Sequence, residues 1–93
     1  MRIVGYIEHP TLKITVFKND GRSSVKFETA LYEQTFKLGD DERFSSLEGV
    51  QALVDNQMLN RVLEGFRQMH AARLESIARN FLPETSVSFE EII

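Results

Sequence analysis

Residues 12–28, LKITVFKNDGRSSVKFE, decide the fold of this chain. Apolar and polar residues alternate on both sides of Asn19-Asp20-Gly21, three residues that favour a tight turn. Successive side chains of a β-strand point to opposite faces, so this alternation is typical of strands that are buried on one side only. The stretch therefore predicts two antiparallel strands joined by a hairpin.

The same alternation extends toward both ends of this stretch. Residues 2–8 precede it across a His9-Pro10-Thr11 turn, and residues 31–38 follow it. Around Thr29-Ala30-Leu31 the apolar positions change parity, which indicates either a turn or a β-bulge. The sequence thus predicts an antiparallel meander over residues 2–38, with four strands if the break is a turn and three if it is a bulge.

One face of this sheet should be apolar, because the apolar residues of each strand share one parity. The predicted core face consists of Ile3, Ile7, Leu12, Ile14, Val16, Val25 and Phe27 in the first three strands and of Tyr32, Phe36 and Leu38 in the fourth. A sheet with one apolar face needs a second layer to cover it. Helices that follow the sheet are expected to form that layer.

Two helices are expected over about residues 46–81. Ser45 and Glu48 have the spacing of a capping box, in which two side chains satisfy free backbone N–H groups at a helix start. A short first helix should begin there, with an inner face of Leu47, Val50, Leu53 and Val54. Asp55-Asn56 favours the start of a second, longer helix after a bend.

Pro83 determines where the long helix ends. The residue before a proline is disfavoured in helical geometry, so the helix should end at Asn80 or Phe81. Residues 83–93 are predicted to be either flexible or strand-forming. The predicted fold is therefore a two-layer α+β domain that extends over residues 1–93.

Length and composition fit one compact cytoplasmic domain. The chain has 93 residues, 42% of them hydrophobic, and no cysteine, which excludes disulfides and fits a reducing compartment. No apolar run reaches the roughly 18 residues that a membrane span requires, so no membrane association is expected. A net charge of −3 makes nucleic acid a poor candidate partner, because phosphate binding depends on several Lys and Arg side chains.

Recognisable catalytic motifs are absent from the sequence. The five glycines provide no GxGxxG spacing, and there is no HExxH run or serine nucleophile motif. His70 has no metal-binding side chain three or four residues away along its helix. We therefore expect no enzyme activity, no cofactor and no metal site.

The apolar stripe of the long helix contains two polar residues. At about 100° per residue the stripe is formed by Leu59, Val62, Leu63, Phe66, Leu74, Ile77 and Phe81. His70 and Arg73 lie near its middle. Either the helix buries these two polar groups, or the stripe runs past the core and meets something else. Taken singly, His70 is expected to be hydrogen-bonded at the edge of the core, and Arg73 to keep its charged group in water.

Two features favour a second chain as the cover of this stripe. Mostly small residues recur at the spacing of two helices in contact, at Gly65, Met69, Ala72 and Ser76. A helix over residues 56–80 is roughly 37 Å long, whereas a seven-residue strand spans about 23 Å. The principal prediction is a homodimer, with an unknown protein as the other possible partner. Its candidate interface is Gly65, Phe66, Met69, His70, Ala72, Arg73, Ser76, Ile77 and Phe81.

Two alternatives stay open. The outward face of the sheet carries aromatic and basic residues, which single-stranded nucleic-acid binders use for base stacking and phosphate contact. These residues are Tyr6, Lys13, Phe17, Lys26 and Lys37, although the same face has glutamates that can form ordinary cross-strand pairs with them. The other alternative is a small anionic ligand in a pocket near His70 and Arg73.

Overall fold

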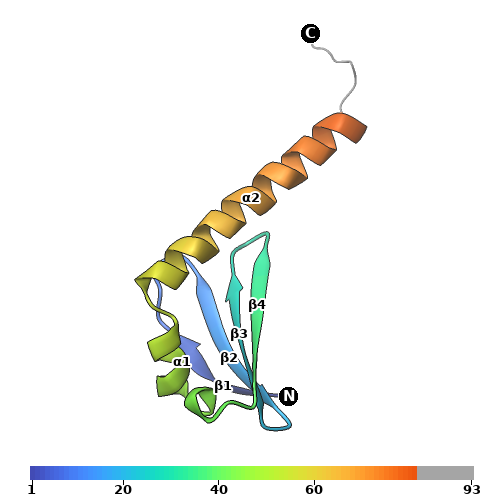
Figure 1. The fold of residues 1–93 in the computed structure, drawn as a ribbon. Coiled ribbons are helices and arrows are strands. Elements are labelled where there is room, and N and C mark those ends of the chain that lie inside the picture. Colours follow the sequence, from blue (N-terminus) through green and yellow to red (C-terminus); the bar gives the residue numbers. More distant parts are fainter. Residues whose placement is uncertain (82–93) are drawn as a thin grey trace.

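The computed structural model describes residues 1–81, which form a four-stranded antiparallel sheet followed by helices (Figure 1). The strands, in their spatial order, are β1 (Arg2–Ile7), β2 (Lys13–Asn19), β3 (Arg22–Glu28) and β4 (Glu33–Gly39). A 3-10 helix, η1 (Glu42–Phe44), then precedes α1 (Leu47–Leu53) and α2 (Asn56–Asn80). The predicted α+β fold, with a meander followed by a short and a long helix, is confirmed. The prediction for the tail, 83–93, lies outside the described residues.

Local sequence explains the turns of the meander. Asp20 and Gly21 both have a positive φ, 52° and 74°, as a two-residue type I′ hairpin requires. The parity change after β3 is a turn, in which the Thr29 hydroxyl accepts hydrogen bonds from the N–H groups of Leu31 and Tyr32 at 3.3 and 3.0 Å. Of the two alternatives left by the sequence, four strands is therefore correct.

Two β-bulges lie elsewhere, and one of them corrects the predicted core face. In β1 the pairing passes from Ile3 with Phe17 to Gly5 with Val16, so Val4 is an extra residue. An extra residue reverses the parity of everything before it. Ile3 consequently lies on the outward face, 50% exposed, and its prediction as a core residue is wrong. The second bulge shifts the register between β3 and the end of β4.

The core lies between the other face of the sheet and the two helices. Its buried residues are Leu12, Ile14, Val16, Val25, Phe27, Val50, Val54, Val62 and Phe66. α1 approaches β1 closely because Gly5 has no side chain: a Cβ at that position would lie only 2.8 Å from Cδ2 of Leu47. Both helices thus cover the same face of the sheet.

The start of α1 differs from the prediction by one residue. Its N-cap is Ser46, whose hydroxyl accepts a hydrogen bond from the N–H of Gly49 at 3.2 Å. Ser45 instead belongs to η1 and donates its hydroxyl to the carbonyl oxygen of Glu42 at 2.8 Å. The predicted capping box of Ser45 with Glu48 is therefore wrong.

The two ends of α2 are as predicted. Asp55 is the N-cap and accepts a hydrogen bond from the N–H of Met58 at 2.8 Å. The helix ends at Asn80, with Phe81 as its C-cap. α2 therefore has 25 residues, enough to extend beyond the sheet that it covers.

Candidate functional site

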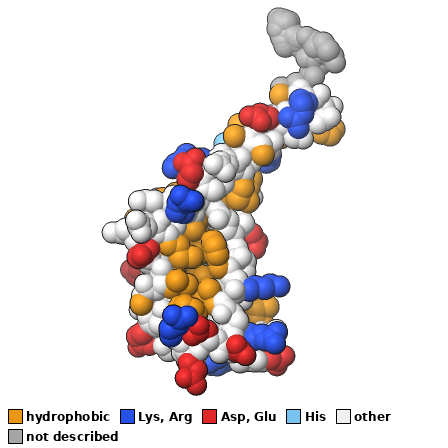
Figure 2. All heavy atoms as spheres, viewed as in Figure 1, with side chains coloured by type: hydrophobic (Ala, Val, Ile, Leu, Met, Phe, Trp, Pro, Cys, Tyr) orange, Lys and Arg blue, Asp and Glu red, His pale blue; other side chains and the backbone are white. Residues whose placement is uncertain are grey.

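α2 is attached to the sheet along its first half only. Val62 and Phe66 are buried, and Leu59, Leu63 and Met69 pack against the core. After these residues the helix projects beyond the sheet (Figure 1). Hydrophobic side chains continue along this projecting half, between charged ones (Figure 2). Leu74 and Phe81 are 49% and 79% exposed there.

Gly65 belongs to the attached half. A Cβ at Gly65 would lie 2.9 Å from Nε2 of Gln34 in β4. The same Nε2 donates a hydrogen bond to the carbonyl oxygen of Val62 at 2.8 Å. The missing side chain thus allows β4 to reach the helix backbone.

The residues of the predicted interface therefore fall into two groups, one that packs within its own chain and one that lies beyond the sheet. Gly65 lies against β4, Phe66 is part of the core, and Met69 packs against that core. The members that remain exposed or half-buried beyond it are His70, Ala72, Arg73, Ser76, Ile77 and Phe81. A second chain has access to α2 mainly from His70 onward.

His70 marks the point at which α2 leaves the sheet. Its Nδ1 lies 2.9 Å from the hydroxyl of Tyr32, within hydrogen-bond distance. The two rings also meet edge to face, with centroids 5.8 Å apart and an interplanar angle of 76°. His70 is thus exposed and hydrogen-bonded at the edge of the core, as expected of this residue taken singly, and α2 does not bury it.

A groove of about 520 Å³ runs beside this hydrogen bond, between the two hairpin tips and α2. It is lined by Thr11, Leu12, Thr29, Tyr32, Leu63, Phe66, Arg67 and His70. Arg73 is not part of this lining, and among residues 1–81 it has no ion-pair partner. The small-anion hypothesis requires His70 and Arg73 to line one pocket. In this groove only His70 does so.

The five residues predicted for nucleic-acid binding share the outward face of the sheet. Residues that pair side by side across the four strands form what we call a cross-strand row. Tyr6 and Lys26 share one row, and Phe17 and Lys37 share the next. Lys13 lies in the row on the other side of Tyr6. The ammonium of Lys13 lies 6.0 Å from the Tyr6 ring centroid, and that of Lys26 lies 5.3 Å from the Phe17 ring centroid. Positive charge and aromatic surface are thus adjacent on this face.

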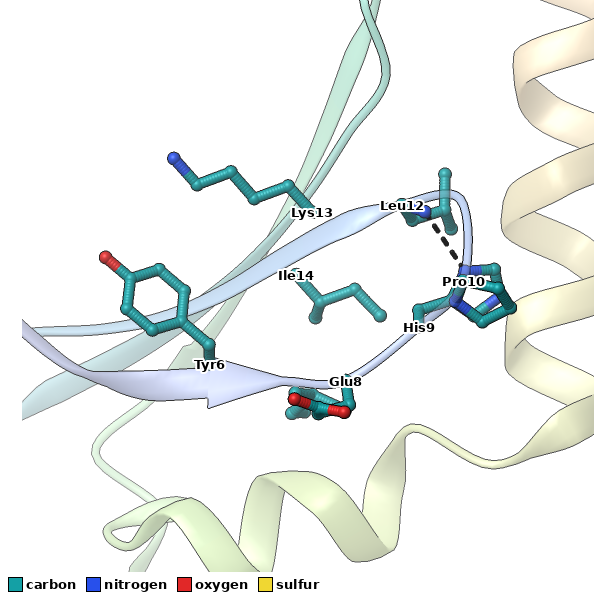
Figure 3. A pocket seen from close by; sticks show the side chains of 8 residues that line it. Tyr6, Glu8, His9, Pro10, Leu12, Lys13 and Ile14 are labelled. Carbon is teal, nitrogen blue, oxygen red and sulfur yellow. Dashed lines mark hydrogen bonds between the residues drawn. The ribbon is translucent and has the colours of Figure 1, made fainter.

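A pocket of about 540 Å³ lies at the β1–β2 hairpin (Figure 3). His9 lines it, and its Nδ1 accepts hydrogen bonds from the N–H groups of Thr11 and Leu12, both at 3.1 Å. These bonds occupy Nδ1 as an acceptor, so His9 stabilises the turn and has only Nε2 free for other chemistry. The sequence marks this segment as a turn but does not indicate that the histidine side chain closes it.

Within the described residues, no group of three His, Asp or Glu side chains is placed to hold a metal ion. No helix of this part of the chain has an apolar stretch long enough to cross a bilayer. No protein-family model, curated protein or solved structure matches the chain. Among residues 1–81, the projecting half of α2 and the outward face of the sheet have features beyond those that the fold needs.

Proposed function

We propose that this chain is a non-enzymatic interaction module that forms a homodimer through the projecting half of α2. The observation that carries the proposal is the apolar stripe that continues past the sheet, where Leu74 and Phe81 remain exposed. Ile77 lies on the same face of the helix and is half-buried. Exposed apolar surface in one continuous patch is typical of a protein contact site.

A second copy is well suited to cover this stripe, because two identical helices can cover each other about a twofold axis. In one antiparallel register, Leu74 of one copy lies opposite Ile77 of the other, which pairs apolar with apolar. Arg73 lies at the edge of this contact, where its stem can pack while the guanidinium reaches water.

This register also gives the groove beside His70 an occupant. His70 and Phe81 lie equally far from the centre of the helix contact, so Phe81 of one copy faces His70 of the other. The groove wall there includes Leu12, Leu63 and Phe66. An aromatic ring that enters it buries its apolar surface and meets the ring pair of Tyr32 and His70.

Size-exclusion chromatography with light scattering tests the homodimer. The full chain should elute with twice the mass of the 10.7 kDa monomer. The double variant Leu74→Glu, Ile77→Glu places carboxylates in the contact and should be monomeric. Arg79→Glu is the matched control, because it lowers the net charge by the same two units at an exposed position on the opposite side of α2.

The helical circular dichroism signal of each variant shows whether α2 is retained. A chain truncated before Pro83 is measured beside the full chain, so that residues 83–93 do not decide the result. Monomeric masses for both chains at submillimolar concentration would refute the homodimer. Equal dissociation by Arg79→Glu would refute the proposed register of contact.

A further inference from the structure

The charges on the outward face of the sheet are separated along the strands. The row of Lys13 also contains Glu28 and Glu33. Toward the other end, the strand register places Lys26 and Lys37 in rows without an acidic residue. The Lys26 ammonium lies 3.7 Å from the Glu28 carboxylate, at the boundary between the two ends. One end of the face therefore carries both acidic and basic side chains, and the other end is basic.

The basic end is also concave. A pocket of about 450 Å³ there is lined by Asn19, Arg22, Ser23, Ser24, Lys37, Gly39 and Asp40. Arg22 and Lys37 are both exposed, and Asp40 is the one acidic residue of the lining. A guanidinium, an ammonium and a serine hydroxyl in one hollow are suited to bind phosphate oxygens.

One aromatic ring borders this pocket, and a second ring lies beyond it on the same face. Phe17 is in the same cross-strand row as Lys37, and Tyr6 is its diagonal neighbour in the next row. Diagonal neighbours of this kind are about 7–8 Å apart. Tyr6 is 53% exposed, and both helices pack on the other face of the sheet. Successive bases of an unpaired strand can therefore stack on neighbouring rings.

Thr15 lies between these rings and has an unused hydroxyl. The residue is only 2% exposed, and its Oγ1 has no hydrogen-bond partner within the described part of the chain. Its neighbours on this face include Lys13 and Lys26, whose long side chains can turn aside. Since an unpaired buried hydroxyl is destabilising, a ligand that bonds to it gains an interaction that the free protein lacks.

We propose that the outward face of the sheet binds a short single-stranded nucleic acid. One base stacks on Phe17, the next base stacks on Tyr6, and the phosphates bind at Lys26 and in the pocket of Arg22 and Lys37. The projecting half of α2 takes no part in this contact, so the binding is independent of the proposed homodimer. The glutamates in the row of Lys13 limit the bound segment to a few nucleotides.

Fluorescence anisotropy with labelled oligothymidine and oligouridine at low salt tests this binding. With two or three phosphates bound, the slope of log K against log salt should be about −1.4 to −2.1. Phe17→Ala should weaken binding roughly 5- to 150-fold, the loss expected for one stacked base. Lys37→Glu should also weaken it, whereas the matched control Arg61→Glu makes the same charge change on the exposed surface of α2 and should leave it unchanged.

Each variant is checked for folding by circular dichroism, and Phe17→Leu keeps an apolar side chain where Phe17→Ala does not fold. Absence of binding at low salt would overturn the proposal. So would equal affinity for an abasic strand or for oligoglutamate, because either result would mean that charge alone is recognised. Light scattering on the same variants reports the homodimer separately, so the two proposals succeed or fail independently.

Discussion

Replacing Phe66 or Leu74 by alanine should show that the two halves of α2 contribute differently to the free energy of unfolding. Both residues belong to the apolar stripe, but Phe66 is 7% exposed and Leu74 is 49% exposed. Phe66→Ala removes a ring that packs in the core, and such truncations cost about 3–5 kcal/mol because a cavity remains. Leu74→Ala in an isolated chain loses about half of one leucine's burial and leaves no enclosed cavity, so its cost is about 1 kcal/mol or less.

Urea unfolding, followed by circular dichroism at low and high protein concentration, measures both free-energy losses. The loss for Leu74→Ala should increase with concentration, because dimerisation stabilises the wild-type chain by mass action. The loss for Phe66→Ala should be large already at low concentration, and Phe66→Leu provides a milder variant that remains folded. A Leu74→Ala loss as large as that of Phe66→Ala at low concentration would refute the reasoning, because Leu74 would then be packed within its own chain.

Three further substitutions test local features. The Arg43 side-chain and backbone N–H groups donate hydrogen bonds to Asp41 and lower the pKa of its carboxyl from 3.8 to about 2. This contribution to stability is present above pH 3.8 and is lost as the pH falls toward 2. Acid-unfolding curves of Asp41→Asn and wild type should therefore differ at neutral pH and converge near pH 2; parallel curves would exclude the ion pair as the cause. Thr15→Val removes the unpartnered hydroxyl and should raise the free energy of unfolding in urea by about 1 kcal/mol, while oligonucleotide binding weakens; a loss of stability would mean that the hydroxyl has a partner. Gly49→Ala directs a Cβ at the carbonyl oxygen of Arg43 and should lower Tm by more than about 4 °C, although alanine otherwise favours helix; a higher Tm would show that η1 moves freely.

Alternation of residue types is sufficient to predict the strands of this chain, since period two is a local property of the sequence. It fails at Ile3, because one inserted residue at Val4 reverses the parity and nothing local marks the insertion. The same limit explains the capping error at Ser45. Two adjacent serines can each accept the bond, and the geometry of η1 decides that Ser46 does so.

The candidate surfaces show a similar division. The shared outward position of Tyr6, Phe17 and the three lysines follows from strand parity and a register that the turns determine. The role of Gly65 could not be predicted, because it depends on Gln34, which is distant in the sequence. Helical spacing alone gives the same pattern for a glycine that faces its own sheet and for one that faces a partner.

The projecting half of α2 has an energetic need that the rest of the described chain, residues 1–81, does not meet. A helical segment of this length is marginally stable in water without packing. Its own contacts are local, such as the hydrogen bond from Nδ2 of Asn80 to the carbonyl oxygen of Ser76 at 2.8 Å. A chain without cysteine also has no disulfide to supplement a small core. Association through α2 would supply both requirements at once, since it packs the projecting segment and adds apolar burial, while the opposite face of the sheet stays open to a ligand.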